Sequence, residues 1–195
     1  MELQELKSKV EKCAKCSLSK TRVNLVFGTG SENAEILFVG EAPGYYEDIK
    51  GEPFVGKAGK LLDKLLNSIG MSRKDVYIAN VLKCRPPNNR NPLPEEIEEC
   101  RPYLKQQIKI IKPKVVCTLG NFATRLILGE KLGITSLRGK KFEGDGYFIF
   151  PTFHPAAVLR NPGMGVDFKK DLETMKKLVE EGEKITEKDV QLELF

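Results

Sequence analysis

"EILFVGE", residues 35–41, sets the architecture of the chain, because four consecutive apolar residues and a glycine lie between two glutamates. A short apolar run of this kind predicts a strand that is buried on both faces, as in parallel sheets. Residues 56–70 follow with a helical pattern, in which leucines recur on one face and Gly70 supplies the C-terminal stop. A buried strand followed by an amphipathic helix is the repeating unit of α/β domains.

The same alternation continues along the chain. We expect further strands at 75–84, 114–120 and 147–155, and further helices at 93–111, 121–129 and 167–184. Pro102 is expected to kink or restart the helix in which it lies. The pattern predicts one three-layer α/β/α domain over residues 1–183, built around a mostly parallel four-stranded sheet, with a tail at 184–195.

Length and composition indicate an ordinary globular protein. The 195 residues are enough to bury roughly 70% of the unfolded surface. No apolar run approaches the ~20 residues of a membrane span, and the N-terminus reads as a charged amphipathic helix and not as a signal peptide. We therefore expect a cytoplasmic monomer without membrane association.

Positive residues concentrate in loops that contain Gly, Pro and Asn, although the formal net charge is only +5. Basic loops suit a phosphate backbone, but they also suit a solvated, charge-rich surface. The residues concerned are Lys12, Lys15, Lys20, Arg22, Lys83, Arg85, Arg90, Arg138, Lys140, Lys141 and Arg160.

Four cysteines share this basic setting: Cys13, Cys16, Cys84 and Cys100. Four thiolates saturate either a zinc ion or an iron–sulfur cluster, and the spacing alone leaves both open. A reducing compartment favours such ligation over disulfides. The fifth cysteine, Cys117, lies in an apolar run and is expected to be a buried core thiol.

Ligands of parallel sheets bind beyond the carboxyl ends of the strands. The segment after residue 40 has glycines and precedes a helix N-terminus, which makes it a natural anion site, but it matches neither a Walker loop nor a G-x-G-x-x-G loop. His154, the only histidine, ends the last strand. There it either has a structural role or donates a hydrogen bond to a developing oxyanion. Asn80 ends the second strand. Its side chain either caps a turn or offers a donor and an acceptor to the amide-like edge of a ligand.

Three segments carry a family resemblance: "GEAPGYYEDIKGEPFVGKAGKLLD" (40–63), "NVLKCRPPNNRNP" (80–92) and "HPAAVLRNP" (154–162). With the four-cysteine spacing, they resemble the family-four uracil-DNA glycosylases, the iron–sulfur branch of that superfamily, from Cys13 to about Pro162. The resemblance implies a four-iron, four-sulfur cluster on the four cysteines, with zinc as the alternative metal.

The resemblance also implies roles at the strand ends. Phe54 would stack on a uracil flipped out of DNA, and Asn80 would pair with its O4 and N3–H. Glu47 would exclude the methyl group of thymine, His154 would donate to uracil O2, and Leu159 would fill the vacated stack. Core packing is the alternative for Phe54 and Leu159, and a merely solvated carboxylate is the alternative for Glu47.

Gly40 and Ala42 belong to the implied uracil-binding segment. Ala42 stands where the best-known branch of the superfamily carries a water-activating aspartate, and alanine cannot activate water. Glu41 is the nearest carboxylate, and we expect it to position the attacking water or to stabilise the oxocarbenium sugar.

The C-terminal residues Gln191, Leu192, Leu194 and Phe195 resemble a short peptide that docks on replication sliding clamps. The alternative is a final segment that packs on the domain.

The interpretation of the whole chain is a monofunctional DNA repair glycosylase that acts on uracil-containing DNA. A non-catalytic iron–sulfur nucleic-acid-binding or clamp-associated module and an enzyme for another deaminated base remain as alternatives. No lysine is placed as a Schiff-base nucleophile, so lyase activity is not expected.

Overall fold

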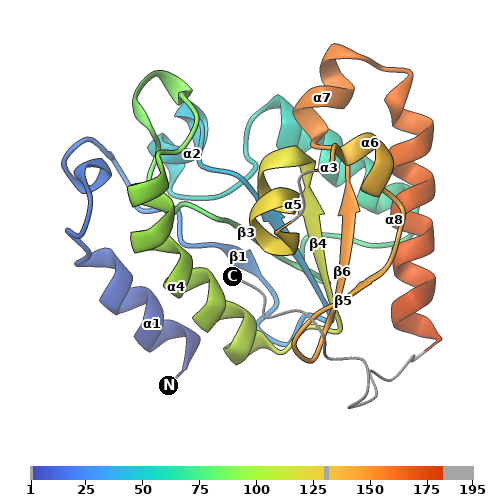
Figure 1. Cartoon of the computed structure of the whole chain (residues 1–195), viewed down its shortest axis with the longest axis horizontal. Helices are drawn as coiled ribbons and strands as arrows, with labels where there is room; N and C mark the ends of the chain where they lie inside the picture. Colours follow the sequence, from blue (N-terminus) through green and yellow to red (C-terminus); the bar gives the residue numbers. More distant parts are fainter. Residues whose placement is uncertain (1, 130–131, 182–195) are drawn as a thin grey trace.

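The computed structural model describes residues 2–129 and 132–181. This part of the chain contains one sheet of six strands in the order β1-β3-β2-β4-β6-β5 (Figure 1). The strands are β1 (Thr29–Gly30), β2 (Ile36–Gly40), β3 (Tyr77–Asn80), β4 (Val115–Leu119), β5 (Phe142–Glu143) and β6 (Phe148–Thr152). Neighbours among β3, β2, β4 and β6 pair in parallel, so their carboxyl ends meet at one edge of the sheet.

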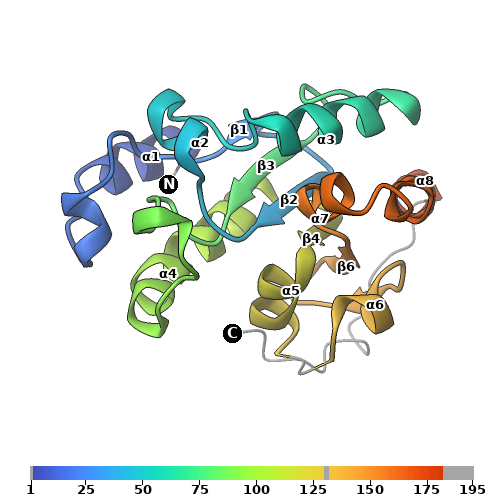
Figure 2. The same cartoon turned by 90° about the horizontal axis from the view of Figure 1, so that it is seen from above.

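Helices cover both faces of this sheet (Figure 2). The α-helices of the described ranges are α1 (Leu3–Glu11), α2 (Tyr45–Lys50), α3 (Lys57–Ser68), α4 (Pro94–Ile111), α5 (Gly120–Leu128), α6 (Ile134–Leu137), α7 (Pro155–Arg160) and α8 (Met164–Glu180). Short 3-10 turns occur at Ser17–Lys20 and Pro87–Asn89.

Successive side chains of β2 pack alternately in two separate hydrophobic cores, one on each face of the sheet. Leu37 and Val39 pack in the core that includes residues of α1, α4 and α5. Ile36 and Phe38 pack in the other core, with residues of α3 and α8. Because both faces are covered, every residue of β2 is buried, which explains its unbroken apolar run. The predicted three-layer α/β/α architecture is therefore confirmed.

The predicted number of strands is wrong. Four strands were expected, but β1 and β5 add an antiparallel pair at each edge of the sheet. Each of these edge strands has only two residues, which is too short to show a two-residue alternation. Of the two outcomes expected at Pro102, a kink or a restart, the restart does not occur, since α4 continues through Pro102 as one helix. A proline removes only one backbone donor, and the buried residues Leu104 and Ile108 anchor the turn that follows.

Cys117 is fully buried in β4, as expected for a core thiol. Within the described ranges, no helix combines the length and the apolar character that crossing a bilayer requires.

Candidate active site

The carboxyl edge of the sheet brings distant segments together. Gly40 and Asn80 are register partners in β2 and β3, and the segment after β6 leads from the same edge to His154. A Cβ atom at Gly40 would lie 2.4 Å from Asn80 Oδ1 and 2.7 Å from Phe54 Cζ. Glycine is therefore required at position 40, because the Asn80 amide and the Phe54 ring close over its backbone.

A cleft of about 1210 Å³ opens at this edge. Its walls include six of the eight residues that sequence analysis named for catalysis or uracil binding: Glu41, Ala42, Glu47, Phe54, Asn80 and His154. Gly40 lies beneath Phe54 and Asn80 instead of lining the cleft. Leu159 also lies outside the lining, and it is 46% exposed on α7, so core packing does not explain it.

His154 presents a neutral imidazole to the cleft. Its Nδ1 accepts a hydrogen bond from the backbone N–H of Ala156, at 3.1 Å, so Nε2 is the ring atom that carries the proton. The pKa of His154 is lowered to about 4, mainly by burial and also by the positive charge of Arg160, while Glu47 opposes the shift. Nε2 is therefore a hydrogen-bond donor on an uncharged ring at neutral pH.

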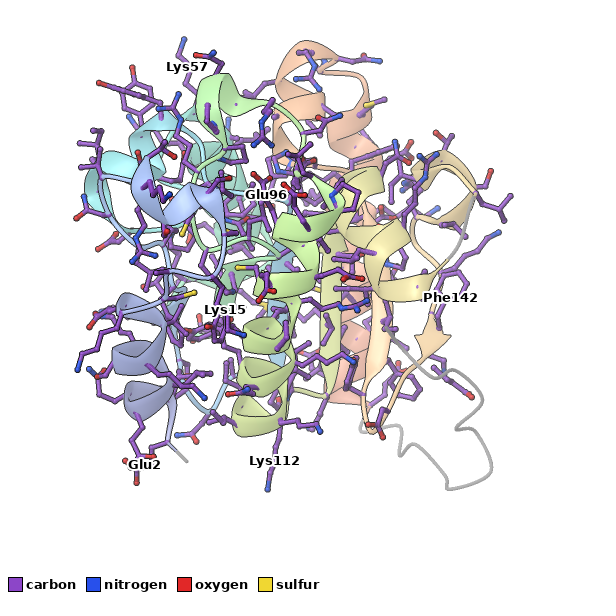
Figure 3. The ribbon with its side chains drawn as sticks, turned by 60° about the vertical axis from the view of Figure 1, so that its left-hand side comes forward. Glu2, Lys15, Lys57, Glu96, Lys112 and Phe142 are labelled. Carbon is purple, nitrogen blue, oxygen red and sulfur yellow. The ribbon has the colours of Figure 1, made fainter. Side chains whose placement is uncertain are left out.

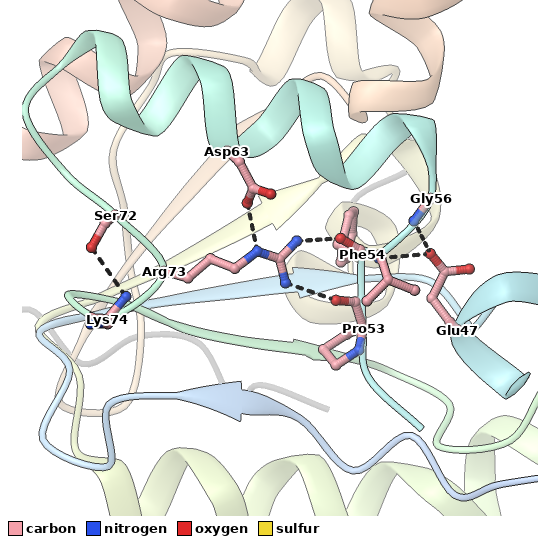
Figure 4. Close-up of polar contacts among 9 residues, drawn as sticks. Glu47, Pro53, Phe54, Gly56, Asp63, Ser72, Arg73 and Lys74 are labelled. Atoms are coloured by element: carbon pink, nitrogen blue, oxygen red, sulfur yellow. Dashed lines mark hydrogen bonds and ion pairs between the residues drawn. The ribbon is translucent and has the colours of Figure 1, made fainter. Parts of the chain in front are cut away.

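Phe54 lies beside this imidazole, with ring centroids 5.5 Å apart and planes inclined at 33°. It is 6% exposed, so most of the side chain packs in the core with residues of α3, as the alternative interpretation expected, and it also lines the cleft. Its loop is fixed by Glu47, whose Oε1 accepts from the backbone N–H groups of Val55 at 3.0 Å and Gly56 at 3.1 Å (Figure 4). A solvated carboxylate therefore does not describe Glu47.

Asn80 is 2% exposed, and its carboxamide makes no hydrogen bond to any residue in the described part of the chain. A buried amide needs partners, and the cleft that Asn80 lines is where they would come from. Its backbone oxygen is already used, because it accepts from the Lys83 ammonium at 2.7 Å. A turn-capping role for the side chain is thus not observed.

Glu41 follows β2 and lines the same cleft, next to Ala42. Burial raises the pKa of the Glu41 carboxyl. Its backbone oxygen accepts from the Leu82 N–H at 3.0 Å, which extends the β2–β3 contact past the last paired residues. The hydrogen bond to Leu82 therefore fixes the backbone of Glu41 at the carboxyl ends of β2 and β3, where its side chain lines the cleft.

The four cysteines Cys13, Cys16, Cys84 and Cys100 line a second, mostly apolar cavity, between the end of α1, the loop after β3 and α4. Figure 3 shows the molecule from a side where Lys15 and Glu96, which also line this cavity, are in view. Arg22 Nη1 donates to Cys84 Sγ and the Lys83 N–H donates to Cys100 Sγ, both at 3.2 Å.

The donor set of this cavity fits a thiolate-bound metal group. The pKa of Cys100 is raised to about 12, mainly by burial; Lys83 opposes the shift, and the nearby thiols Cys84 and Cys16 add to it. Thiolates are the form in which cysteines bind a metal, and a bound cation favours that form. The described residues do not, however, include three or more His, Cys, Asp or Glu side chains already gathered at the spacing that one metal ion requires.

Lys83 connects the two sites. Its side chain is fully buried and donates to Asn80 O and, at 2.6 Å, to Gln107 Oε1, while its backbone N–H faces Cys100. The end of β3 is thereby fixed between the cysteine cavity and the cleft.

Sequence reasoning missed several residues of the cleft. Asn121 and Arg125 of α5 line it, although nothing in their helical pattern marks them. With Arg90, whose guanidinium is paired with Glu96, and Arg160, Arg125 makes three arginines among the residues that line the cleft. Such groups suit an anionic polymer.

Comparisons with known proteins agree with this geometry. The model of the uracil DNA glycosylase superfamily matches residues 27–181. A type-4 uracil-DNA glycosylase of Archaeoglobus fulgidus is 48% identical over 184 residues, covering 90% of this chain and 92% of the relative. Those of Thermotoga maritima and Saccharolobus solfataricus are 49% and 45% identical; they cover 82% and 99% of this chain, and 85% and 91% of their own lengths.

Proposed function

The chain belongs to the uracil DNA glycosylase superfamily, and on this premise we propose that it is a DNA repair enzyme that hydrolyses the N-glycosidic bond of deoxyuridine in DNA. The products are free uracil and an abasic site. The observation that carries the proposal is the cleft that Phe54, Asn80 and His154 share, because a stacking ring, an amide edge and a neutral N–H donor are what an extruded pyrimidine requires.

Base recognition is assigned to Phe54 and Asn80. A base inside a duplex is out of reach, so the nucleotide must be flipped into the cleft, which costs a few kcal/mol. Stacking on Phe54 offsets about 1–3 kcal/mol of that cost. The unpaired Asn80 amide donates to uracil O4 and accepts from N3–H, whereas cytosine presents the reversed pattern.

Bond cleavage is assigned to His154 and Glu41. As the glycosidic bond breaks, negative charge develops on uracil O2, and a donor already aimed at that position lowers the barrier. The His154 Nε2–H is such a donor, and because the ring is neutral, no proton needs to leave it. Glu41 positions the attacking water or stabilises the positive sugar, a task for which Ala42 has no functional group.

Glu47 and Leu159 complete the assignment. Glu47 lines the cleft and would crowd the C5 position of the base, which excludes the thymine methyl group. Leu159, exposed on α7 next to Arg160, would enter the space that the flipped base vacates.

A uracil-containing oligonucleotide tests the function directly. Incubation with the purified protein should release free uracil, and alkali should then cleave the strand at that position. An oligonucleotide that stays intact after alkali would leave the non-catalytic nucleic-acid-binding alternative. Cleavage at hypoxanthine or xanthine but not at uracil would favour the enzyme for another deaminated base.

A four-iron, four-sulfur cluster on Cys13, Cys16, Cys84 and Cys100 is the cofactor that we propose, on the strength of the all-thiol donor set and the kinship with type-4 enzymes. When bound, the cluster would crosslink α1 to the loop after β3 and to α4, which is a structural role. The cytoplasmic location that the sequence predicts would keep these thiols available.

Purified protein is expected to be brown and to hold about four iron atoms per chain. Cys100→Ser should lose most of the iron and lower the melting temperature, because one ligand is removed. Cys117→Ala is the matched control: it removes the cysteine outside the cavity, so its iron content should stay unchanged. A colourless protein that holds zinc would contradict the cluster.

The clamp peptide, with Gln191, Leu192, Leu194 and Phe195, lies outside the described residues, as does the rest of the predicted tail 184–195. It stays a proposal, together with the monomeric state. Deleting the last five residues should abolish binding to a sliding clamp without changing uracil release. Unchanged clamp affinity would end the idea.

A further inference from the structure

Phe54 has a backbone conformation that a bulky residue rarely adopts. Its φ angle is +54°, in the left-handed region that favours glycine. Such a conformation persists only where the surrounding structure imposes it, and it tends to occur at functional sites. The contacts that hold Phe54 in place therefore matter for the direction in which its ring points.

Arg73 supplies these contacts from outside the cleft. Its guanidinium donates through Nη1 to Pro53 O, at 3.0 Å, and through Nη2 to Phe54 O (Figure 4). Its Nε donates to Asp63 Oδ1 at 2.5 Å, so α3 fixes the guanidinium in turn. A planar group with donors in a rigid arrangement can bind two successive carbonyls and a carboxylate at once, whereas the ammonium of lysine is a compact charge without that planar arrangement.

The opposite side of the same loop is equally constrained. Glu47 accepts from the two N–H groups that follow Phe54, as described above. A Cβ atom at Gly59 would lie only 1.6 Å from Phe54 O, so α3 packs directly against that carbonyl. With its carbonyl bound by Arg73 and the next two N–H groups bound by Glu47, Phe54 has little freedom to rotate its backbone.

Arg73 is not among the residues that line the cleft, so we do not expect it to contact a base bound there. We propose that Arg73, oriented by Asp63, is a positioning residue that sets the plane of the Phe54 ring for stacking on the extruded base. This inference rests on the proposed function. It assigns to an Arg–Asp pair outside the cleft a share of the base-binding energy that stacking on Phe54 provides.

The test is a double-mutant cycle in single-turnover uracil release. Stacking on an aromatic ring is worth about 1–3 kcal/mol per base, which corresponds to about five- to 150-fold in rate. Arg73→Gln should therefore slow release about tenfold in the wild-type background. In a Phe54→Ala background, Arg73→Gln should change the rate less than twofold, because the ring through which it acts is absent.

Two controls separate positioning from stability. Lys114→Gln removes another ion pair, with Glu35 at the amino ends of the strands, and should leave the rate unchanged. Affinity for a duplex without uracil should be the same for Arg73→Gln and wild type, because phosphate contacts are not altered. If Arg73→Gln is unfolded at the assay temperature, Asp63→Asn replaces it in the cycle, with a smaller decrease that again requires Phe54.

Three outcomes decide the matter. A decrease that disappears without Phe54 supports the inference. Equal decreases in both backgrounds would mean a general structural role and would overturn it, and so would an unchanged rate. If the wild-type protein itself releases no uracil, the proposed function fails, which is a different result from wild-type activity that is indifferent to Arg73.

Discussion

Replacing His154 by alanine is expected to slow uracil release by about a hundredfold or more, while the affinity for DNA stays nearly unchanged. The Nε2–H donor meets negative charge that exists only as the glycosidic bond breaks, so its loss raises the barrier and not the dissociation constant. Single-turnover rates and equilibrium binding on the same oligonucleotide measure the two effects separately.

His154→Gln is the matched variant, because its amide N–H has a reach similar to that of Nε2 and should restore part of the rate. Lower DNA affinity with an unchanged chemical step would contradict the assigned role.

The pH dependence of this role follows from the lowered pKa of His154. Its ordinary value is 6.5 and burial lowers it to about 4, so the folded protein keeps the ring neutral over the range where an exposed histidine would be charged. Uracil release should therefore show no His154-dependent decline between pH 7 and pH 5. The unfolded chain binds this proton first, so the contribution of His154 to stability is present above pH 6.5 and is lost as the pH falls toward 4.

Nuclear magnetic resonance can observe this titration without ambiguity, since His154 is the only histidine in the chain. A titration near pH 6.5 would contradict the lowered pKa.

Asn80→Asp is expected to lower the rate of uracil release by about a hundredfold or more, because a carboxylate cannot donate to uracil O4 and repels it. The same carboxylate can accept from the exocyclic amine of cytosine, so the preference between the two bases should move toward cytosine. Rates on matched oligonucleotides with uracil or cytosine at one position measure the change.

Asn67→Asp introduces the same charge on the exposed surface of α3 and should leave both rates as in wild type. An Asn80→Asp variant that still releases uracil at the wild-type rate would remove Asn80 from base recognition.

The parallel core of the fold was predictable because burial on both faces leaves an unmistakable apolar run, as in residues 36–39. The edge strands were not, because two-residue strands are held by the neighbours with which they pair and not by their own pattern. Local sequence carries no signal for an element that depends on a partner distant in the chain.

The candidate site was partly predictable for a related reason. Residues that follow parallel strands, such as Asn80 and His154, must meet at one edge, so their position in the sequence is enough to group them. Arg73 follows no strand, and its partners are backbone carbonyls, which every residue has. Its contacts with Pro53 and Phe54 become visible only once α3 is placed against the loop.

A crystal structure of the protein with free uracil tests most directly whether Phe54, Asn80 and His154 bind the base together in one cleft. The ring of uracil should lie against Phe54, with O4 and N3 facing the Asn80 carboxamide and O2 within hydrogen-bonding distance of His154 Nε2. Uracil bound elsewhere on the molecule, or in the cleft with O2 turned away from His154, would contradict this arrangement.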